Sequence, residues 1–298
     1  MILLSKTIFF PFLFKRSNKI AATQKRIQNI NDYLTYRTWF YTTRGLYEED
    51  RLMFTLLLAL RIDLRRGKIR HDEFEVLIKG GASLDLNTCP TKPFRWLNDI
   101  AWLNLLELSR VKDFHDVIDC IQKNEKVFKD WFDKESIDLP DTYESLTVFH
   151  RFLFIRSISP DRTIFETRNY IQDSLGVKYT EIPVLSFDVL WDESQCKTPL
   201  LGILSSGADP TSNIQALAKK KNVELLIVSM GQGQEILARR YLHQTMTHGG
   251  WLLIQNAHLG LDYLDEFYET MRTANFEPSF RVFVIFSSSL SLCLLSQY

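Results

Sequence analysis

The chain has 298 residues, about twice the length of a typical domain, so its length favours two globular units. Hydrophobic residues make up 45% of it and charged residues 24%, with only 12 Gly and 9 Pro, which excludes collagen-like, low-complexity and largely disordered chains. The 36 basic and 36 acidic residues give a formal net charge of zero, which disfavours nucleic acids and anionic membranes as partners, because both bind through a basic excess.

The spacing of the cysteines and the length of the apolar runs bear on two further classes, proteins held together by metals or disulfides and proteins that span a membrane. The four cysteines are Cys89, Cys120, Cys196 and Cys293, with no C-x-x-C pair and no His at ligand spacing. We therefore expect no metal site and no disulfide framework, but free thiols in a reducing compartment. The longest apolar runs, 8–14 and 52–60, fall short of the about 20 residues that a membrane span needs, so no membrane crossing is expected.

The two ends of the chain differ from the rest. The first 31 residues carry six Lys or Arg and no acidic residue. We expect residues 1–19 to form a leader ahead of the first helix, with mitochondrial targeting as a minor alternative. Residues 287–298 are apolar without a cap or a turn, so they indicate a chain that stops inside a domain.

Residues 20–176 show helical spacing of apolar side chains and predict a helical domain. The stripes at 27–34 and 114–121 each suit one buried helix face. The predicted helices include residues 52–64, 71–79 and 94–109, and a helix that starts at Thr163. Glycines at 67 and at 80–81 mark the ends of the first two. The 94–109 helix is apolar on most sides, so we expect it at the centre of a bundle.

In residues 177–298 the spacing of apolar side chains changes, and the new pattern predicts an α/β domain. Four short apolar runs occur, at 199–204, 223–228, 251–254 and 281–286. Amphipathic stretches of helical length separate them, which is typical of a parallel sheet whose strands are buried on both faces. The predicted fold class is therefore a helical domain followed by an α/β domain of the P-loop type.

The loop after the first strand is the first candidate site, because α/β domains bind ligands at the carboxyl ends of their strands. Residues 205–211 take the position of a phosphate-binding loop and offer Gly207, Asp209 and Thr211. The loop lacks the second glycine and the lysine of G-x-x-x-x-G-K-[ST]. The carboxylate of Asp209 would repel a phosphate and cap the next helix in its place, so we expect a capped turn.

The loops after the second and third strands are the other candidates. Gly231 and Gly233 follow the second strand, but two glycines suit any tight turn and are weak evidence for a nucleotide. Gln255 and Asn256 end the third strand, where a P-loop ATPase has acidic residues that hold magnesium and orient water. Neutral amides there do not support hydrolysis. We expect His258 to be a structural histidine.

Two arginines are candidates for an interface. Arg156 and Arg162 flank residues 157–161, just before the helix that starts at Thr163. An arginine at such a junction can reach a phosphate on a neighbouring subunit, as arginine fingers do. Local salt bridges are the alternative.

Long segments of the chain resemble the motor region of dynein heavy chains, in order, across residues 20–286. These segments are NDYLTYRTWFYTTRGLYEEDRLMFTLLLALRIDLRRG at 31–67, LIKGGASLDL at 77–86, PFRWLNDIAWLNLLELS at 93–109, NEKVFKDWFDKE at 124–135, LFIRSISPDRT at 153–163, TPLLGILSSGADPT at 198–211, VSMGQGQEILARR at 228–240 and GGWLLIQNAHLGLDYLDEF at 249–267. The resemblance is to the axonemal, outer-arm type.

The resemblance implies the end of the fifth AAA+ module, with residues 20–176 as a lid-like region, and part of the sixth, with 177–298 as a degenerate, truncated AAA+ α/β domain. In that family ATP and Mg act in earlier modules, so this chain itself is expected to bind no cofactor. The implied role is to transmit ring rearrangements in ATP-driven movement along microtubules. The implied partners are neighbouring AAA+ modules and, through the complete motor, intermediate and light chains and microtubules. The implied location is the cytoplasm, cytoskeleton and ciliary axoneme.

Residues 1–14 and those after Phe286 depart from the family pattern, which suggests a partial product. Two other functions stay open. One is a nucleotide-binding enzyme that uses the loops 205–211 and 229–235, which the missing lysine and acidic pair disfavour. The other is a free-standing helical interaction module whose exposed apolar patches dock partners.

Overall fold

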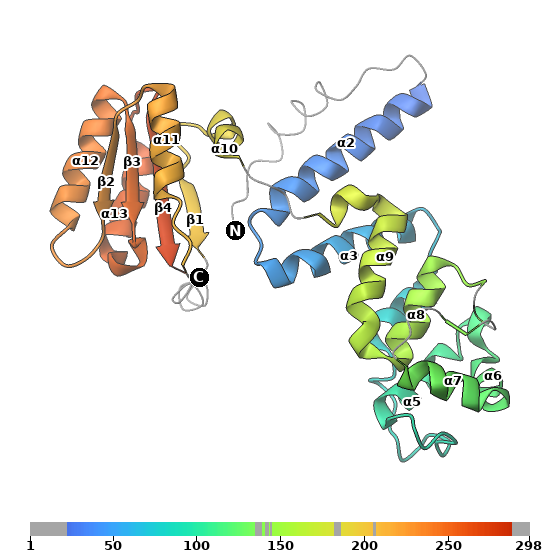
Figure 1. The fold of residues 1–298 in the computed structure, drawn as a ribbon. Coiled ribbons are helices and arrows are strands. Elements are labelled where there is room, and N and C mark those ends of the chain that lie inside the picture. Colours follow the sequence, from blue (N-terminus) through green and yellow to red (C-terminus); the bar gives the residue numbers. More distant parts are fainter. Residues whose placement is uncertain are drawn as a thin grey trace. The chain divides into compact units, whose positions relative to one another are not determined.

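A computed structural model describes residues 23–134, 139–140, 143, 145–181, 186–204 and 207–287. The leader expected at 1–19 lies outside these residues, and so does the apolar end expected at 287–298, apart from Ser287. The chain divides between residues 183 and 184 into two compact units, which we call the helical unit and the α/β unit (Figure 1). None of the helices in the described ranges has the length and apolar character that crossing a bilayer requires.

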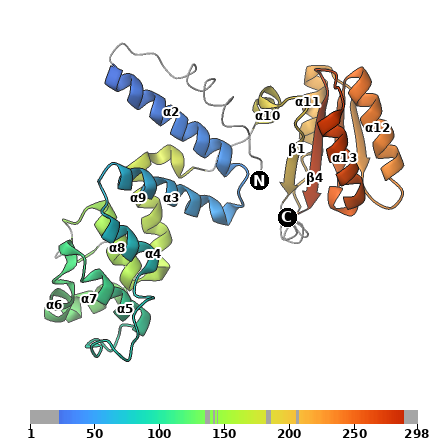
Figure 2. The same ribbon diagram turned by 180° about the vertical axis from the view of Figure 1, so that it is seen from behind.

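The helical unit is built around one buried helix. Its elements are α2 (Thr23–Thr43), α3 (Glu48–Arg65), α4 (His71–Lys79), α5 (Asp99–Leu108), η1 (Lys112–Phe114), α6 (Val117–Lys123), α7 (Glu125–Asp133), α8 (Val148–Ile158), η3 (Pro160–Arg162), α9 (Thr163–Leu175) and η4 (Val177–Tyr179). Helix α8 packs against α4, α5 and α9, and Figure 2 shows α4 beside it. Most α8 side chains are buried, including Phe152, Leu153 and Phe154.

Helix α5 is shorter and less central than its sequence suggests. It begins only at Asp99, because the side chain of Asn98 accepts a hydrogen bond of 2.7 Å from the backbone N–H of Ala101 and caps the helix there. Residues 94–97 therefore precede the helix, although the sequence predicted them as its first turn. Ile100 is 70% exposed, so one apolar position of α5 faces away from the core.

A buried hydrogen bond joins two long helices of the helical unit. The hydroxyl of Tyr170, on α9, donates to Oδ2 of Asp63, on α3, over 2.9 Å. Burial, and then the charge of Asp63, raise the pKa of Tyr170 above its ordinary value. Tyr179 is also buried, and burial followed by the charge of Asp32 raises its pKa to about 12. Both phenols are therefore held in the protonated form.

We expect the helical unit to lose stability in alkali. Tyrosine in the unfolded chain has a pKa of about 10, so the two raised pKa values stabilise the fold fully below that pH and lose this effect as pH rises towards 12. The urea midpoint, followed by circular dichroism, should fall between about pH 8 and about pH 11. Tyr170→Phe should reduce this fall, whereas Tyr47→Phe, at an exposed position, should not. An equal fall of the urea midpoint in both variants would contradict the assignment of this effect to Tyr170.

The α/β unit contains the four parallel strands that the sequence predicted. Its elements are α10 (Phe187–Glu193), β1 (Leu200–Leu204), α11 (Thr211–Lys221), β2 (Leu225–Ser229), α12 (Glu235–His248), β3 (Trp251–Gln255), η5 (Ala257–Leu259), α13 (Leu261–Thr273) and β4 (Arg281–Ser287). The strand order is β1-β4-β3-β2, and every pair is parallel. The predicted fold class is confirmed.

Helices cover both faces of this sheet. Side chains alternate between faces along a strand, so Leu252 and Ile254 pack with α12 and α13, while Trp251 and Leu253 pack with α10 and α11. All four are 0% exposed. An unbroken apolar run is what a strand buried on both faces requires, which explains why β3 was clear in the sequence.

Candidate functional site

The carboxyl edge of the sheet brings three candidate loops to one side, because all four strands run in the same direction. Ser205 and Ser206 of the first loop lie outside the described residues. At the end of this loop the backbone N–H of Thr211 donates to Oδ1 of Asp209 over 2.9 Å, and the hydroxyl of Thr211 donates to the same oxygen. These bonds, the hydroxyl first, hold the pKa of the Asp209 carboxyl below its usual value. Asp209 thus supplies the negative charge at the start of α11.

A second hydrogen bond links this loop to the end of β3. The side-chain amide Nε2 of Gln255 donates to Oγ1 of Thr211 over 2.6 Å. The hydroxyl of Thr211 therefore donates to Asp209 and accepts from Gln255. In a P-loop the equivalent hydroxyl binds magnesium. Here the hydroxyl is already engaged, Gln255 is neutral and the nearest charge is the anionic Asp209, so these residues do not fit Mg-ATP.

Asn256 turns away from this chain of bonds. Its backbone is left-handed, with φ of 50°, and its Nδ2 donates to Oγ of Ser229, at the end of β2, over 2.9 Å. The backbone N–H of Met230 donates to the carbonyl oxygen of Gln255 over 2.8 Å. The predicted pair Gln255 and Asn256 is thus split, with one amide tied to the first loop and the other to the second.

The three candidate glycines make turns and take part in no shared site. Gly207 and Gly233 both have φ of +81°, a conformation that favours glycine. Gly231 accepts a hydrogen bond of 3.1 Å from the backbone N–H of Gln234, which closes the turn before α12. Among the described residues no hydrogen bond joins this turn to Thr211.

A cavity lies beside this edge, between the starts of α12 and α13. It has a volume of about 590 Å³ and is lined by Glu235, Ile236, Arg239, His258, Leu259, Gly260, Leu261, Asp262 and Tyr263. Arg239 is already engaged, because its Nε lies 2.8 and 2.9 Å from the two carboxylate oxygens of Glu266. No sequence motif connects these two helices, so Glu235, Arg239 and Tyr263 could not be predicted as neighbours.

Arg156 and Arg162 do not share a site either. Nη2 of Arg162 donates to the carbonyl oxygen of Phe132 over 2.6 Å, and its guanidinium lies 4.7 Å from the ring centre of Trp131. Nη2 of Arg156 instead points to the carbonyl oxygen of Ile78, 3.5 Å away. Arg162 thus fixes the start of α9 to α7, and Arg156 faces α4.

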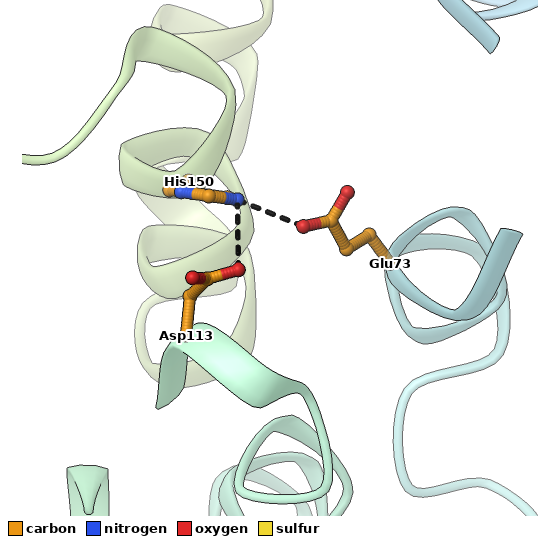
Figure 3. Close-up of side chains that lie close together, drawn as sticks. All are labelled: Glu73, Asp113 and His150. Carbon is orange, nitrogen blue, oxygen red and sulfur yellow. Dashed lines mark hydrogen bonds and ion pairs between the residues drawn. The ribbon is translucent and has the colours of Figure 1, made fainter. Parts of the chain in front are cut away.

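A cluster that the sequence did not predict lies in the helical unit. Figure 3 shows Glu73, Asp113 and His150, from α4, η1 and α8. Nε2 of His150 is 2.9 Å from Oε1 of the buried Glu73 and 4.0 Å from Oδ2 of Asp113. One His and two carboxylates within this distance have the chemistry of a metal site. Their wide separation in the sequence hides them from any spacing rule.

A guanidinium already neutralises these carboxylates. Nη2 of Arg70 lies 2.8 Å from Oε1 of Glu73 and 2.8 Å from Oδ2 of Asp113. The backbone N–H of Arg70 donates to Oε2 of Glu73 over 2.8 Å. The Arg70 side chain also holds the pKa of the Asp113 carboxyl below its usual value. A divalent cation would meet this positive charge, so we interpret the group as an ion-pair cluster that joins three elements.

Comparison with known proteins gives one consistent match. Residues 195–295 match the family model described as dynein heavy chain region D6 P-loop domain. The chain is 50% identical over 280 residues to mouse dynein axonemal heavy chain 5, and 50% identical over 274 residues to human dynein axonemal heavy chain 8. It is 37% identical over 281 residues to the dynein gamma chain of the flagellar outer arm from Chlamydomonas reinhardtii. These alignments cover 90% to 92% of this chain and 6% of each relative.

Proposed function

This chain carries the D6 P-loop region of a dynein heavy chain, as its sequence indicated, and we propose that the region is a non-catalytic part of the motor ring. Its role is to transmit conformational change during ATP-driven movement along microtubules. The observation that supports the proposal is the hydrogen-bond chain from Asp209 through Thr211 to Gln255, which engages the Thr211 hydroxyl at the position where a P-loop offers a hydroxyl to magnesium.

The proposed setting is the ciliary axoneme. The names of the relatives describe axonemal heavy chains and a flagellar outer-arm chain, and this chain spans 6% of their length. On that basis we place it beside other AAA+ modules of the ring, with intermediate chains, light chains and microtubules as partners of the complete motor. ATP and Mg act at other modules in this proposal.

We expect no binding of Mg-ATP to this chain in isothermal titration calorimetry and no release of phosphate. Asp209 occupies the start of α11, where a phosphate would bind, and its carboxylate repels one. The chain with Gln255→Ala is the matched control, and it should give the same flat titration because, among the described residues, the side chain of Gln255 bonds only Thr211. A micromolar affinity in the unchanged chain would favour the nucleotide-binding enzyme instead.

We expect Thr211→Val to destabilise the α/β unit without any nucleotide. The substitution removes both hydroxyl bonds and should lower the free energy of unfolding by about 1 kcal/mol. Thr247→Val is the control, because within the described part of the chain that exposed hydroxyl bonds only the carbonyl oxygen of His243, on its own helix. Urea unfolding measures both. Equal stability of the two variants would mean that the bond chain does not stabilise this edge.

The transmission role is tested in the complete motor that contains this region. Thr211→Val should slow microtubule gliding while basal ATP turnover and the number of nucleotides bound per ring stay unchanged. A ring that loses one bound nucleotide would show that the edge is a nucleotide site. Unchanged gliding would show that the carboxyl edge of the sheet does not transmit the conformational change.

A further inference from the structure

The helical unit contains a cavity that none of the functions above uses. Its volume is about 610 Å³, and it lies where the end of α4, the turn that follows it, α5 and the junction of α8 and α9 meet. Leu84, Ile100, Leu103 and Pro160 give it apolar walls. Its charged lining residues are Lys79 and Arg156, and none of its lining residues is acidic.

Arg156 has no counter-charge in this cavity. Among the described residues its only hydrogen-bond partner is the carbonyl oxygen of Ile78, at 3.5 Å, which is long for a hydrogen bond. Burial lowers its pKa, with no carboxylate to oppose that effect. By contrast, Arg151 on the same helix pairs with the buried Glu166 at 3.3 Å. A half-buried guanidinium without an anion is unfavourable, because desolvation is not offset by an ion pair.

The guanidinium of Arg156 lies close against the glycines of this turn. A Cβ atom on Gly80 would collide with Nη1 of Arg156 and with Oδ1 of Asn104. The backbone N–H of Gly81 donates to that same Oδ1 over 2.8 Å, which holds the turn on α5. Arg156 therefore packs directly on the backbone of Gly80. A group held in this way loses little conformational freedom when it binds a ligand.

We propose that this cavity binds a carboxylate carried on an apolar body. The guanidinium of Arg156 pairs with both carboxylate oxygens, as the fork of an arginine favours. Lys79 also lines the cavity, but its ammonium already pairs with Glu75 at 3.5 Å, so Arg156 supplies the binding charge. Ile100, which is 70% exposed, and Leu103 contact the apolar body. A phosphate dianion is a poorer ligand, because one guanidinium and one exposed lysine leave most of its oxygens facing apolar walls.

The direct test is saturation-transfer difference NMR on the full chain with 4-methylpentanoate as the probe. We expect transfer to the methyl protons in the unchanged chain, and at least a fivefold loss in Arg156→Gln. Arg168→Gln removes an exposed arginine of the same unit and should keep the full signal. Arg156→Lys should recover part of it, because a single ammonium replaces the fork.

Three further measurements test whether the loss of signal reflects misfolding and whether binding requires a carboxylate. Ile100→Asp changes an exposed side chain and places a negative charge at the cavity, so it should abolish binding of the carboxylate while the circular dichroism spectrum is unchanged. In the unchanged chain, 4-methylpentan-1-ol should give less than a fifth of the transfer. Equal transfer from the alcohol, or displacement of the probe by an equimolar amount of inorganic phosphate, would overturn the proposal.

The same assay separates the two sources of such a carboxylate. Acetyl-Leu-Glu-Leu-amide presents the group on a peptide, as a partner protein would, and competes with the free acid. Displacement of the probe at a lower concentration than that of the probe itself assigns the site to a protein side chain. Displacement only at a higher concentration assigns it to a small free acid. Each result supports a carboxylate site, and absence of probe binding to the unchanged chain refutes it.

Discussion

Gly81→Ala should lower the free energy of unfolding of the helical unit by about 3 kcal/mol. A Cβ atom at this position would overlap the backbone carbonyl group of Leu103, on α5. A backbone group has no rotamer to escape into, so the turn must move. That movement breaks the buried 2.8 Å bond from the N–H of Gly81 to Asn104. The free-energy costs of overpacking and of the lost buried hydrogen bond therefore add.

The urea midpoint of the helical transition measures this effect. Gly45→Ala is the matched control, because its Cβ atom would have only the carbonyl oxygen of Thr42 near it, at an ordinary 3.6 Å. The control should be neutral or slightly stabilising, since alanine restricts the unfolded chain more than glycine does. If both variants unfold at the same midpoint, the close approach of Gly81 to α5 is not a constraint on the fold.

Glu73→Gln should also cost the helical unit about 3 kcal/mol, because it breaks a buried ion pair from one side. The Glu73 side chain is 3% exposed and pairs with Arg70 and His150. Glu75→Gln is the control on the same helix. Its partner is Lys79 at 3.5 Å and its side chain is 64% exposed, so the change should stay below about 0.5 kcal/mol.

The melting temperature with and without EDTA completes this experiment. We expect no change, because Arg70 already supplies the positive charge that the carboxylates of Glu73 and Asp113 require. A fall in melting temperature on chelation, restored by zinc, would show that the cluster in Figure 3 holds a metal after all.

Much of the fold was predictable from local pattern. The strands β1 to β4 appeared as apolar runs, and the structure places them within two residues of the predicted bounds. Strand β3 is buried on both faces, which allows few polar side chains, but β1 leaves Leu201 and Ile203 exposed, so the burial predicted for both of its faces was wrong. Helix α4 was predicted with its observed ends, since Gly80 terminates it with φ of 53°. The start of α5 was wrong because the capping bond of Asn98 prevailed over the apolar pattern before it.

The sites were predictable only where one short segment contains the chemistry. The hydrogen bond from the backbone N–H of Thr211 to Asp209 joins residues two positions apart, so a local pattern could suggest it, although the N-cap residue of α11 is Pro210. The pairing of Gln255 with Thr211 needs the strand order, which brings distant segments together. The same is true of Arg156, whose isolation in an apolar cavity depends on which helices surround it.

The order β1-β4-β3-β2 also decides when the α/β unit can fold during synthesis. Strand β4 lies between β1 and β3, so Leu200 has no strand partner until Phe283 has left the ribosome. The helical unit precedes the α/β unit in the sequence, so it is synthesised before that point. Pairing between such distant residues is slow, because the chain loses the entropy of closing a long loop before stabilising contacts form. On the ribosome, the backbone of β1 therefore stays without a strand partner until β4 has been synthesised, and such an unpaired strand is a target for chaperones.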